Sequence, residues 1–317
     1  MTKLEKAIRK IIHTCLRLHN NESFLILIDQ PNRELGYLLL KTALRVNKDA
    51  LLIETKKHKE IDSEPSAVVK LLLKQIEAVI VVSSSFLTHH KTLRTACHYG
   101  ARVLCLSKLS LEIIERSVNT NFEFIVEKSN RISDLLSIGK IVTLTTPAGT
   151  DITIPISRRK GVADTGMAHE PGMFATLPAG EACITPETGK AEGIVVIDGS
   201  LGPLGLVQRP IELKIKDGYI QKIFGGDEAQ YLRKKLKTFG KEARNFAELG
   251  IGTNPKAIIA GKSIEDEKVL GTAHIAIGDP SLEGGSYHGN CHIDAILKNP
   301  TIEIDGHLIL KDGMLLV

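Results

Sequence analysis

The chain has 317 residues, of which 43% are hydrophobic and 25% charged, so it is long enough for two domains and can bury a full core. It contains no apolar run near the roughly 20 residues that a membrane-spanning helix needs. The net charge is +4 and aromatic residues make up 4%, without a dense basic stripe. We therefore expect neither a membrane nor a nucleic acid as a partner.

The N-terminus and the cysteines indicate the compartment. The first 18 residues are charged throughout and amphipathic, and they lack the apolar core and cleavage site of a signal peptide. Five cysteines occur without a CxxC pair, which favours a reducing compartment. We expect a cytoplasmic protein.

The first part of the chain alternates short apolar strands with helical patterns, which predicts an open, mostly parallel sheet with helices on both faces. The predicted strands are Phe24–Asp29, Ala50–Glu54, Ala78–Ser83, Arg102–Ser107 and Phe122–Val126. The predicted helices cover residues 4–18, 33–46, 64–76, 88–99, 109–117 and 129–138. No glycine-rich phosphate-binding motif follows the first strand, which weakens a nucleotide hypothesis.

From about residue 140 the pattern changes to hairpins and one helix. We predict hairpins at 141–156 and 301–310, further strands at 193–198, 211–216 and 219–224, and a helix at 227–238. The predicted fold class is α/β: an open, mostly parallel domain of flavodoxin or Rossmann type at residues 1–130, then an α+β metal-binding domain at 131–317.

The candidate chemistry lies in the second domain. His292 and Asp294 form a His-x-Asp pair, and the strand period of two places both side chains on one face. His274 lies in a predicted buried strand, where a histidine is either a satisfied core residue or a ligand. Glu248 precedes it within the same fifty residues. Two imidazoles and two carboxylates in one segment favour a metal site.

Glu181 follows a Pro-Ala-Gly turn, and taken alone it is most simply interpreted as an exposed loop residue. However, Pro-Ala-Gly-Glu181, Ala-Glu248-Leu-Gly-Ile-Gly-Thr-Asn, Gly-Thr-Ala-His274-Ile-Ala-Ile-Gly and His292-Ile-Asp294 occur in the order found in the aminopeptidase T (thermophilic leucyl aminopeptidase) metallopeptidases. The chain resembles that family over residues 140–317. The resemblance implies a homodimeric metalloaminopeptidase that acts on small peptides or small molecules.

By resemblance, five side chains hold two divalent metals, which are zinc, cobalt or manganese: Glu181, Glu248, His274, His292 and Asp294. A metal-activated water would then attack the peptide carbonyl. Glu181 and Glu248 thus also enter the predicted catalytic set.

Two further catalytic candidates lie between the histidines. The peptidases carry a tyrosine seven residues after the first metal histidine, where this chain has Ser281, and Tyr287 is the nearest replacement. His288 is either a loop residue or an additional ligand or proton shuttle.

The same architecture also resembles 2,5-dihydroxypyridine dioxygenase, an iron enzyme. That resemblance implies one Fe(II) on His274, His292 and Asp294, with open positions for oxygen and substrate. Glu181 and Glu248 would then lie outside the metal's own ligands. A third alternative is a family member without catalytic turnover. Two other residues are weaker candidates for the site: Glu267, which the acidic start of a helix or loop explains more simply, and His169, on a glycine-rich loop.

Overall fold

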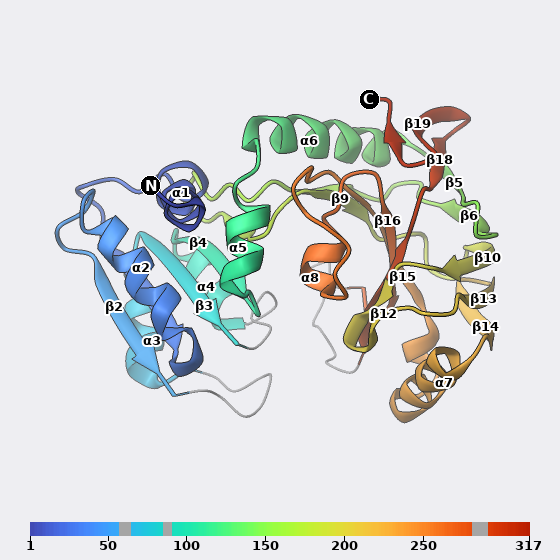
Figure 1. Ribbon diagram of the computed structural model, residues 1–317, viewed down its shortest axis with the longest axis horizontal. Coiled ribbons are helices and arrows are strands. Elements are labelled where there is room, and N and C mark those ends of the chain that lie inside the picture. The colour runs from blue at the N-terminus through green and yellow to red at the C-terminus, as the bar shows by residue number, and fades with distance from the viewer. Residues whose placement is uncertain (57–64, 85–90, 281–290) are drawn as a thin grey trace. The chain divides into compact units, whose positions relative to one another are not determined.

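We describe the fold from a computed structural model of the chain, which describes residues 1–56, 65–84, 91–280 and 291–317. These residues form two compact units (Figure 1). The first comprises Met1–Asn121 with Asp164–Ala179, and the second comprises Phe122–Ala163 with Gly180–Val317. The division into folding domains at residues 1–130 and 131–317 stays a prediction.

The first unit contains a parallel sheet of five strands within the described residues. Their order is β2 (Leu51–Thr55), β1 (Phe24–Asp29), β3 (Ala78–Ser83), β4 (Arg102–Ser107) and β8 (Phe174–Thr176). Every residue of β1, β3 and β4 is buried, as expected for strands covered on both faces. The near-continuous Ile, Val and Leu runs follow from that double burial.

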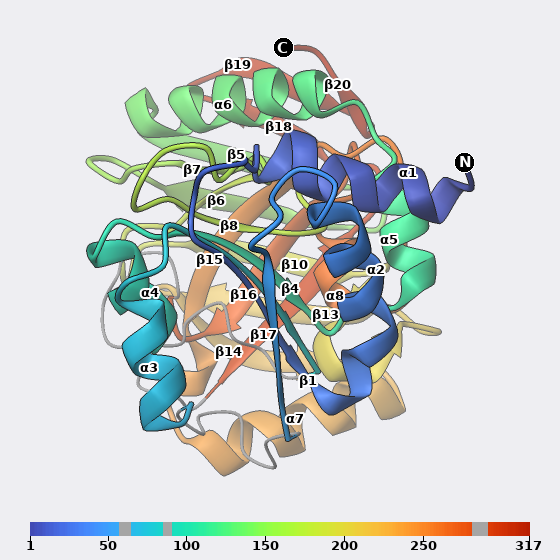
Figure 2. The same cartoon turned by 90° about the vertical axis from the view of Figure 1, so that its left-hand side faces the viewer.

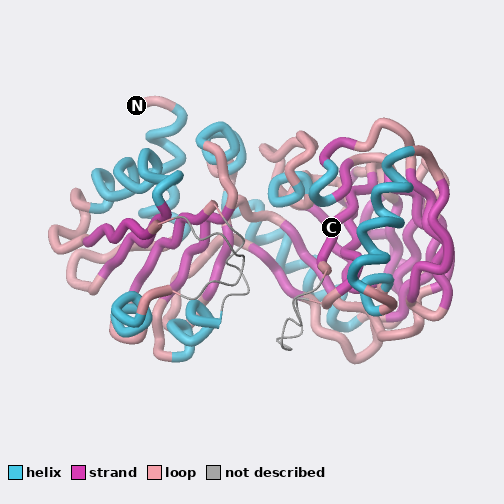
Figure 3. The backbone as a smooth tube through the Cα atoms, turned by 90° about the horizontal axis from the view of Figure 1, so that it is seen from below, coloured by secondary structure: helices cyan, strands magenta, loops and turns pink. Residues whose placement is uncertain are grey.

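Helices cover both faces of this sheet, as Figures 2 and 3 show. The helices are α1 (Lys3–Lys10), α2 (Arg33–Ala43), α3 (Ala67–Leu73), α4 (Lys91–His98) and α5 (Leu111–Ser117). A π-helical turn, Ile11–Cys15, continues α1, and a 3-10 turn, Gln30–Asn32, follows β1. No helix among the described residues has the length and apolar character to cross a bilayer.

The short strand β8 returns to the first unit late in the chain. It pairs in parallel with β4, and buried Arg102 donates from Nη1 to the carbonyl oxygen of Ala168, at 3.0 Å. The imidazole of His169 lies 2.6 Å from the carbonyl oxygen of Thr14, also in this unit. Three residues give too short a pattern for prediction, so β8 was missed.

The second unit contains two large sheets. One has the order β14 (Tyr219–Phe224), β13 (Ile211–Lys216), β10 (Glu192–Ile197), β6 (Asp151–Pro155), β5 (Ile141–Thr145), β18 (Thr301–Ile304), β19 (His307–Lys311) and β20 (Met314–Leu315). The other has the order β12 (Gly205–Leu206), β11 (Ser200–Leu201), β17 (His292–Leu297), β16 (Ala273–Gly278), β15 (Phe246–Gly252), β9 (Glu181–Ile184) and β7 (Val162–Asp164). Short helical turns lie in connections of this unit: Gly202–Leu204 between β11 and β12, Glu242–Arg244 before β15, and α8 (Ser263–Asp266) between β15 and β16.

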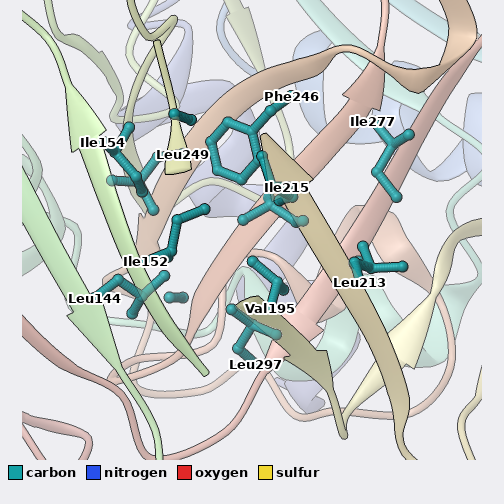
Figure 4. Packing of buried hydrophobic residues seen from close by; sticks show 14 of the residues in the cluster. Leu144, Ile152, Ile154, Val195, Leu213, Ile215, Phe246, Leu249, Ile277 and Leu297 are labelled. Atoms are coloured by element: carbon teal, nitrogen blue, oxygen red, sulfur yellow. The ribbon is translucent and has the colours of Figure 1, made fainter. Parts of the chain in front are cut away.

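The apolar faces of these two sheets share one core. Figure 4 shows side chains of the first sheet beside side chains of the second, among them Leu144, Ile152, Ile154, Val195, Leu213, Ile215, Phe246, Leu249, Ile277 and Leu297. Helix α7 (Asp227–Phe239) contributes Ala229, Leu232 and Leu236 to the same core. The α/β fold class predicted from the sequence is confirmed.

One predicted strand is wrong. Residues 122–126 belong to helix α6 (Phe122–Ile138), which packs against β9. The run Phe-Glu-Phe-Ile-Val is rich in residues with high strand propensity, but its buried positions continue a helical spacing. Those positions are Phe122, Ile125, Ser129, Ile132 and Leu136. The helical period over the whole segment outweighs the local propensity.

Candidate metal centre

Four adjacent strands, β9, β15, β16 and β17, carry all five predicted ligands. Their pairing places Glu181 opposite Gly252, and Glu248 opposite Ala276, which in turn lies opposite Asp294. Paired residues of antiparallel strands point to the same face of a sheet. Residues far apart in the sequence are therefore collected on one face.

Alternation along these strands separates the site from the core. Leu249, Ile251, Ile275 and Ile293 belong to the apolar core between the two sheets, and the predicted ligands occupy the alternate positions. A bulge between Phe246 and Glu248 adjusts the register so that Glu248 points to the site face.

A glycine makes room for His274. The pair Gly250 and His274 lie opposite each other, and a Cβ on Gly250 would fall 2.1 Å from Cε1 of the imidazole. The ring therefore lies directly over the glycine backbone. Its Nε2 is 3.5 Å from Glu181 Oε2 and 3.6 Å from Glu248 Oε1. Its Nδ1 is buried and has no hydrogen-bond partner among the described residues.

His292 and Asp294 form a direct pair. The imidazole Nε2 lies 3.1 Å from Asp294 Oδ1, and Nδ1 lies 2.9 Å from the carbonyl oxygen of Asp279. A carbonyl oxygen only accepts, so Nδ1 carries a proton and donates it to Asp279. That bond fixes the ring orientation and directs Nε2 toward the site.

Lys268 is a part of the site that the sequence did not single out. Its ammonium is buried, 2.6 Å from Glu181 Oε1 and 2.9 Å from Glu267 Oε1. Burial raises the pKa of Glu267 to about 8, although Lys268 opposes this shift. The segment Glu265-Asp266-Glu267-Lys268 resembles an exposed charged helix start, and no periodicity distinguishes it from one.

The charges of the site depend on one another. Burial disfavours the charged form of His274, but Glu248 and Glu181 outweigh burial and raise the pKa of His274 to about 9. Burial also opposes the charge of His292, and Asp294 outweighs it, so the pKa of His292 rises to about 10. Burial acts to raise the pKa of Asp294, but His292 outweighs it and lowers that pKa. Without a metal, both imidazoles are therefore cations at neutral pH.

The donor set fits a divalent metal by its chemistry. Two imidazoles and a carboxylate share one face of adjacent strands, and His274 retains a buried nitrogen without a partner. As the side chains lie, no group of three or more His, Cys, Asp or Glu in the described ranges is placed to hold an ion. Binding a metal therefore requires His274 and His292 to exchange their carboxylate contacts for the ion.

The remaining candidates either fall outside the described residues or lie away from the site face. Tyr287, His288 and Ser281 fall outside the described residues. Cys291, immediately before β17, belongs to the apolar core.

Comparison with known proteins identifies the family. The family model described as 2,5-dihydroxypyridine 5,6-dioxygenase (NicX) matches residues 37–317. The chain belongs to this family. The 2,5-dihydroxypyridine 5,6-dioxygenase of Pseudomonas putida KT2440 is 27% identical over 254 residues, in a match that covers 74% of this chain and 70% of that protein.

Solved structures show which fold this NicX-family chain shares. The 2,5-dihydroxypyridine dioxygenase of Pseudomonas putida KT2440 superposes with a TM-score of 0.87 at 20% identity, over 100% of this chain and 98% of that chain. AmpT of Thermus thermophilus superposes with a TM-score of 0.74 at 16% identity, over 99% of both chains. The resemblance to aminopeptidase T therefore holds for the fold.

The predicted activity is corrected by the family. The sequence favoured a metalloaminopeptidase with zinc or cobalt, a hydrolase and protease, and this prediction is wrong for a NicX-family chain. The dioxygenase alternative agrees with the family instead. The error arose because the motifs of the metal-binding strands resemble those of both kinds of enzyme, and the ligand residue types do not separate them.

Proposed function

We propose that this chain is an Fe(II)-dependent dioxygenase that opens the ring of a small dihydroxylated heteroaromatic substrate such as 2,5-dihydroxypyridine. The observation that carries the proposal is the family match over residues 37–317, in a chain whose site face holds two histidines beside one aspartate. This residue set suits one Fe(II) with open coordination positions. The prediction of two zinc, cobalt or manganese ions has no such support.

In the proposed centre, His274, His292 and Asp294 hold the ion. Bound Fe(II) supplies the positions at which dioxygen and the substrate meet. The Asp279 carbonyl oxygen keeps His292 in the tautomer that presents Nε2 as a ligand. Gly250 lets the His274 ring lie flat over β15.

Glu181 and Glu248 act from beside the ion in this proposal. Glu248 Oε1 lies 3.6 Å from His274 Nε2, so it restrains the orientation of the ring. Glu181 is paired with Lys268. Both glutamates are buried, so they also set the negative field in which a cation binds.

The test is the metal content of protein purified without chelators under low oxygen. We expect one iron per chain, and loss of that iron in His292→Ala and Asp294→Ala. Iron binding that survives in either variant would contradict this ligand set. Two equivalents of another metal in the wild type, with none of iron, would contradict the dioxygenase proposal.

The remaining expectations stay predictions. These are roles for Tyr287 and His288, a homodimer, a cytoplasmic location, and the absence of nucleic-acid and membrane partners. Light scattering on the purified protein would test the dimer.

A further inference from the structure

A buried lysine lies beside two acidic side chains at the edge of the site face. Lys268 is 3% exposed, and its ammonium contacts the carboxylates of Glu181 and Glu267 at 2.6 and 2.9 Å. Buried ammonium groups are rare unless they are paired, because removal from water is costly. Here the pairing partner Glu181 is also one of the five residues that resemble ligands of a two-metal site.

The backbone places this lysine, so its position does not depend on a flexible side chain alone. Asn254 donates its N–H to the carbonyl oxygen of Lys268 at 2.8 Å. A Cβ on Gly252 would fall 2.1 Å from the carbonyl oxygen of Val269, so the chain after Lys268 lies directly on β15 at this glycine. Gly252 is in turn the strand partner of Glu181. The lysine and the glutamate therefore meet because their backbones are held together.

The Glu181 carboxylate cannot bind both the Lys268 ammonium and a second metal ion without bringing the two cations close together. A second divalent ion on Glu181 would stand next to the ammonium of Lys268, and like charges at such short distance repel strongly in a buried site. Moving the ammonium away would remove this cation from the buried carboxylate of Glu181. Hard carboxylates such as Glu181 and Glu248 would otherwise suit a second ion.

We propose that Lys268 takes the place of a second metal cation and thereby restricts the centre to one ion. The inference rests on the proposed function, because it presumes the metal bound by His274, His292 and Asp294. It assigns to Lys268 a role in positioning and selection rather than in contact with the reacting atoms. It also explains how a chain that has all five residues of the two-metal set can hold a single metal.

The experiment counts Zn²⁺, a redox-inert probe, on metal-free full-length protein by equilibrium dialysis and native mass spectrometry. We expect one Zn²⁺ per chain in the wild type and two in Lys268→Met. Lys256→Met, which removes an exposed lysine from the same connection, is the matched control and should bind one. The double variant Lys268→Met/Glu181→Gln should return to one, because the second ion needs Glu181.

The outcomes separate the inference from the proposed function. Two Zn²⁺ in the wild type, or one in a folded Lys268→Met variant, would overturn the role of Lys268 while leaving the metal site intact. No bound Zn²⁺ in the wild type would overturn the metal site itself.

A second variant decides the question if Lys268→Met does not fold. Glu181→Gln in the otherwise wild-type chain should keep one Zn²⁺ with less than a tenfold change in affinity. The reason is that Glu181 pairs with Lys268 and does not bind the ion. Loss of the ion in folded Glu181→Gln would show that Glu181 is a ligand, and would overturn the inference.

Discussion

At the scale of single residues, the site face depends on small side chains as well as on the predicted ligands. Gly250 and Ala276 lie on this face between the predicted ligands, and the His274 ring occupies the place of a Cβ on Gly250. The sequence allowed the five predicted ligands to be named, because they lie in recognisable motifs. It did not single out Lys268, whose neighbours resemble an exposed acidic helix start, and only the tertiary contact with Glu181 reveals it.

Gly250→Ala should weaken metal binding. The added Cβ would fall 2.1 Å from the His274 ring, so the imidazole must turn away from its position. We expect about a 10- to 100-fold loss in metal affinity, as for changes beside a ligand histidine, measured by competition with a chelator of known affinity. The control Gly226→Ala adds a Cβ that meets its nearest neighbour, Arg209 Cδ, at 3.4 Å, and should leave affinity unchanged. Equal affinities in wild type and Gly250→Ala would disprove this account of His274.

Metal binding should release protons. In the metal-free protein the pKa of His274 is about 9 and that of His292 about 10, so both rings are protonated at pH 7. A metal binds only the deprotonated nitrogens, so affinity rises with pH until pH passes these two values. We expect the release of about two protons per ion at pH 7, measured by calorimetry in buffers of different ionisation enthalpy. No proton release would contradict the raised pKa values.

At the scale of the elements, the apolar patterns of the strands account for most of what could be predicted from the sequence. The His-x-Asp pair of β17 was expected to point to one face, and the structure places both side chains there. The strands β1, β3 and β4 also match the predicted ranges, because full burial gives continuous apolar runs. The start of helix α6, residues 122–126, and strand β8 could not be predicted: the first has strand-like composition, and the second pairs across a long sequence separation.

Substitutions at two neighbouring residues of β16 should affect stability and metal binding separately. Ile275 is fully buried in the core, whereas Ala276 lies on the site face between Glu248 and Asp294. Ile275→Ala should lower the free energy of unfolding by about 2–5 kcal/mol and keep the metal. Ala276→Leu should abolish metal binding by filling the site. Urea denaturation and metal analysis test both variants, and retention of metal by Ala276→Leu would show that the site lies elsewhere.

At the scale of the whole molecule, fold and family give different information. AmpT and the Pseudomonas putida dioxygenase both superpose on this chain over nearly its full length, so architecture alone does not choose between their activities. The match of residues 37–317 to the dioxygenase family favours the dioxygenase alternative. The sequence alone could not, because the three ligands of the dioxygenase alternative, His274, His292 and Asp294, are also part of the five-ligand peptidase set.

Oxygen uptake by the iron-loaded protein with 2,5-dihydroxypyridine tests the central proposal most directly. We expect one dioxygen consumed for each substrate ring opened, followed with an oxygen electrode and by the loss of the substrate's ultraviolet absorption. His292→Ala, incubated with the same iron, should consume none. A wild-type protein that holds one iron per chain and yet consumes no oxygen with this substrate or related dihydroxylated heteroaromatics would contradict the account.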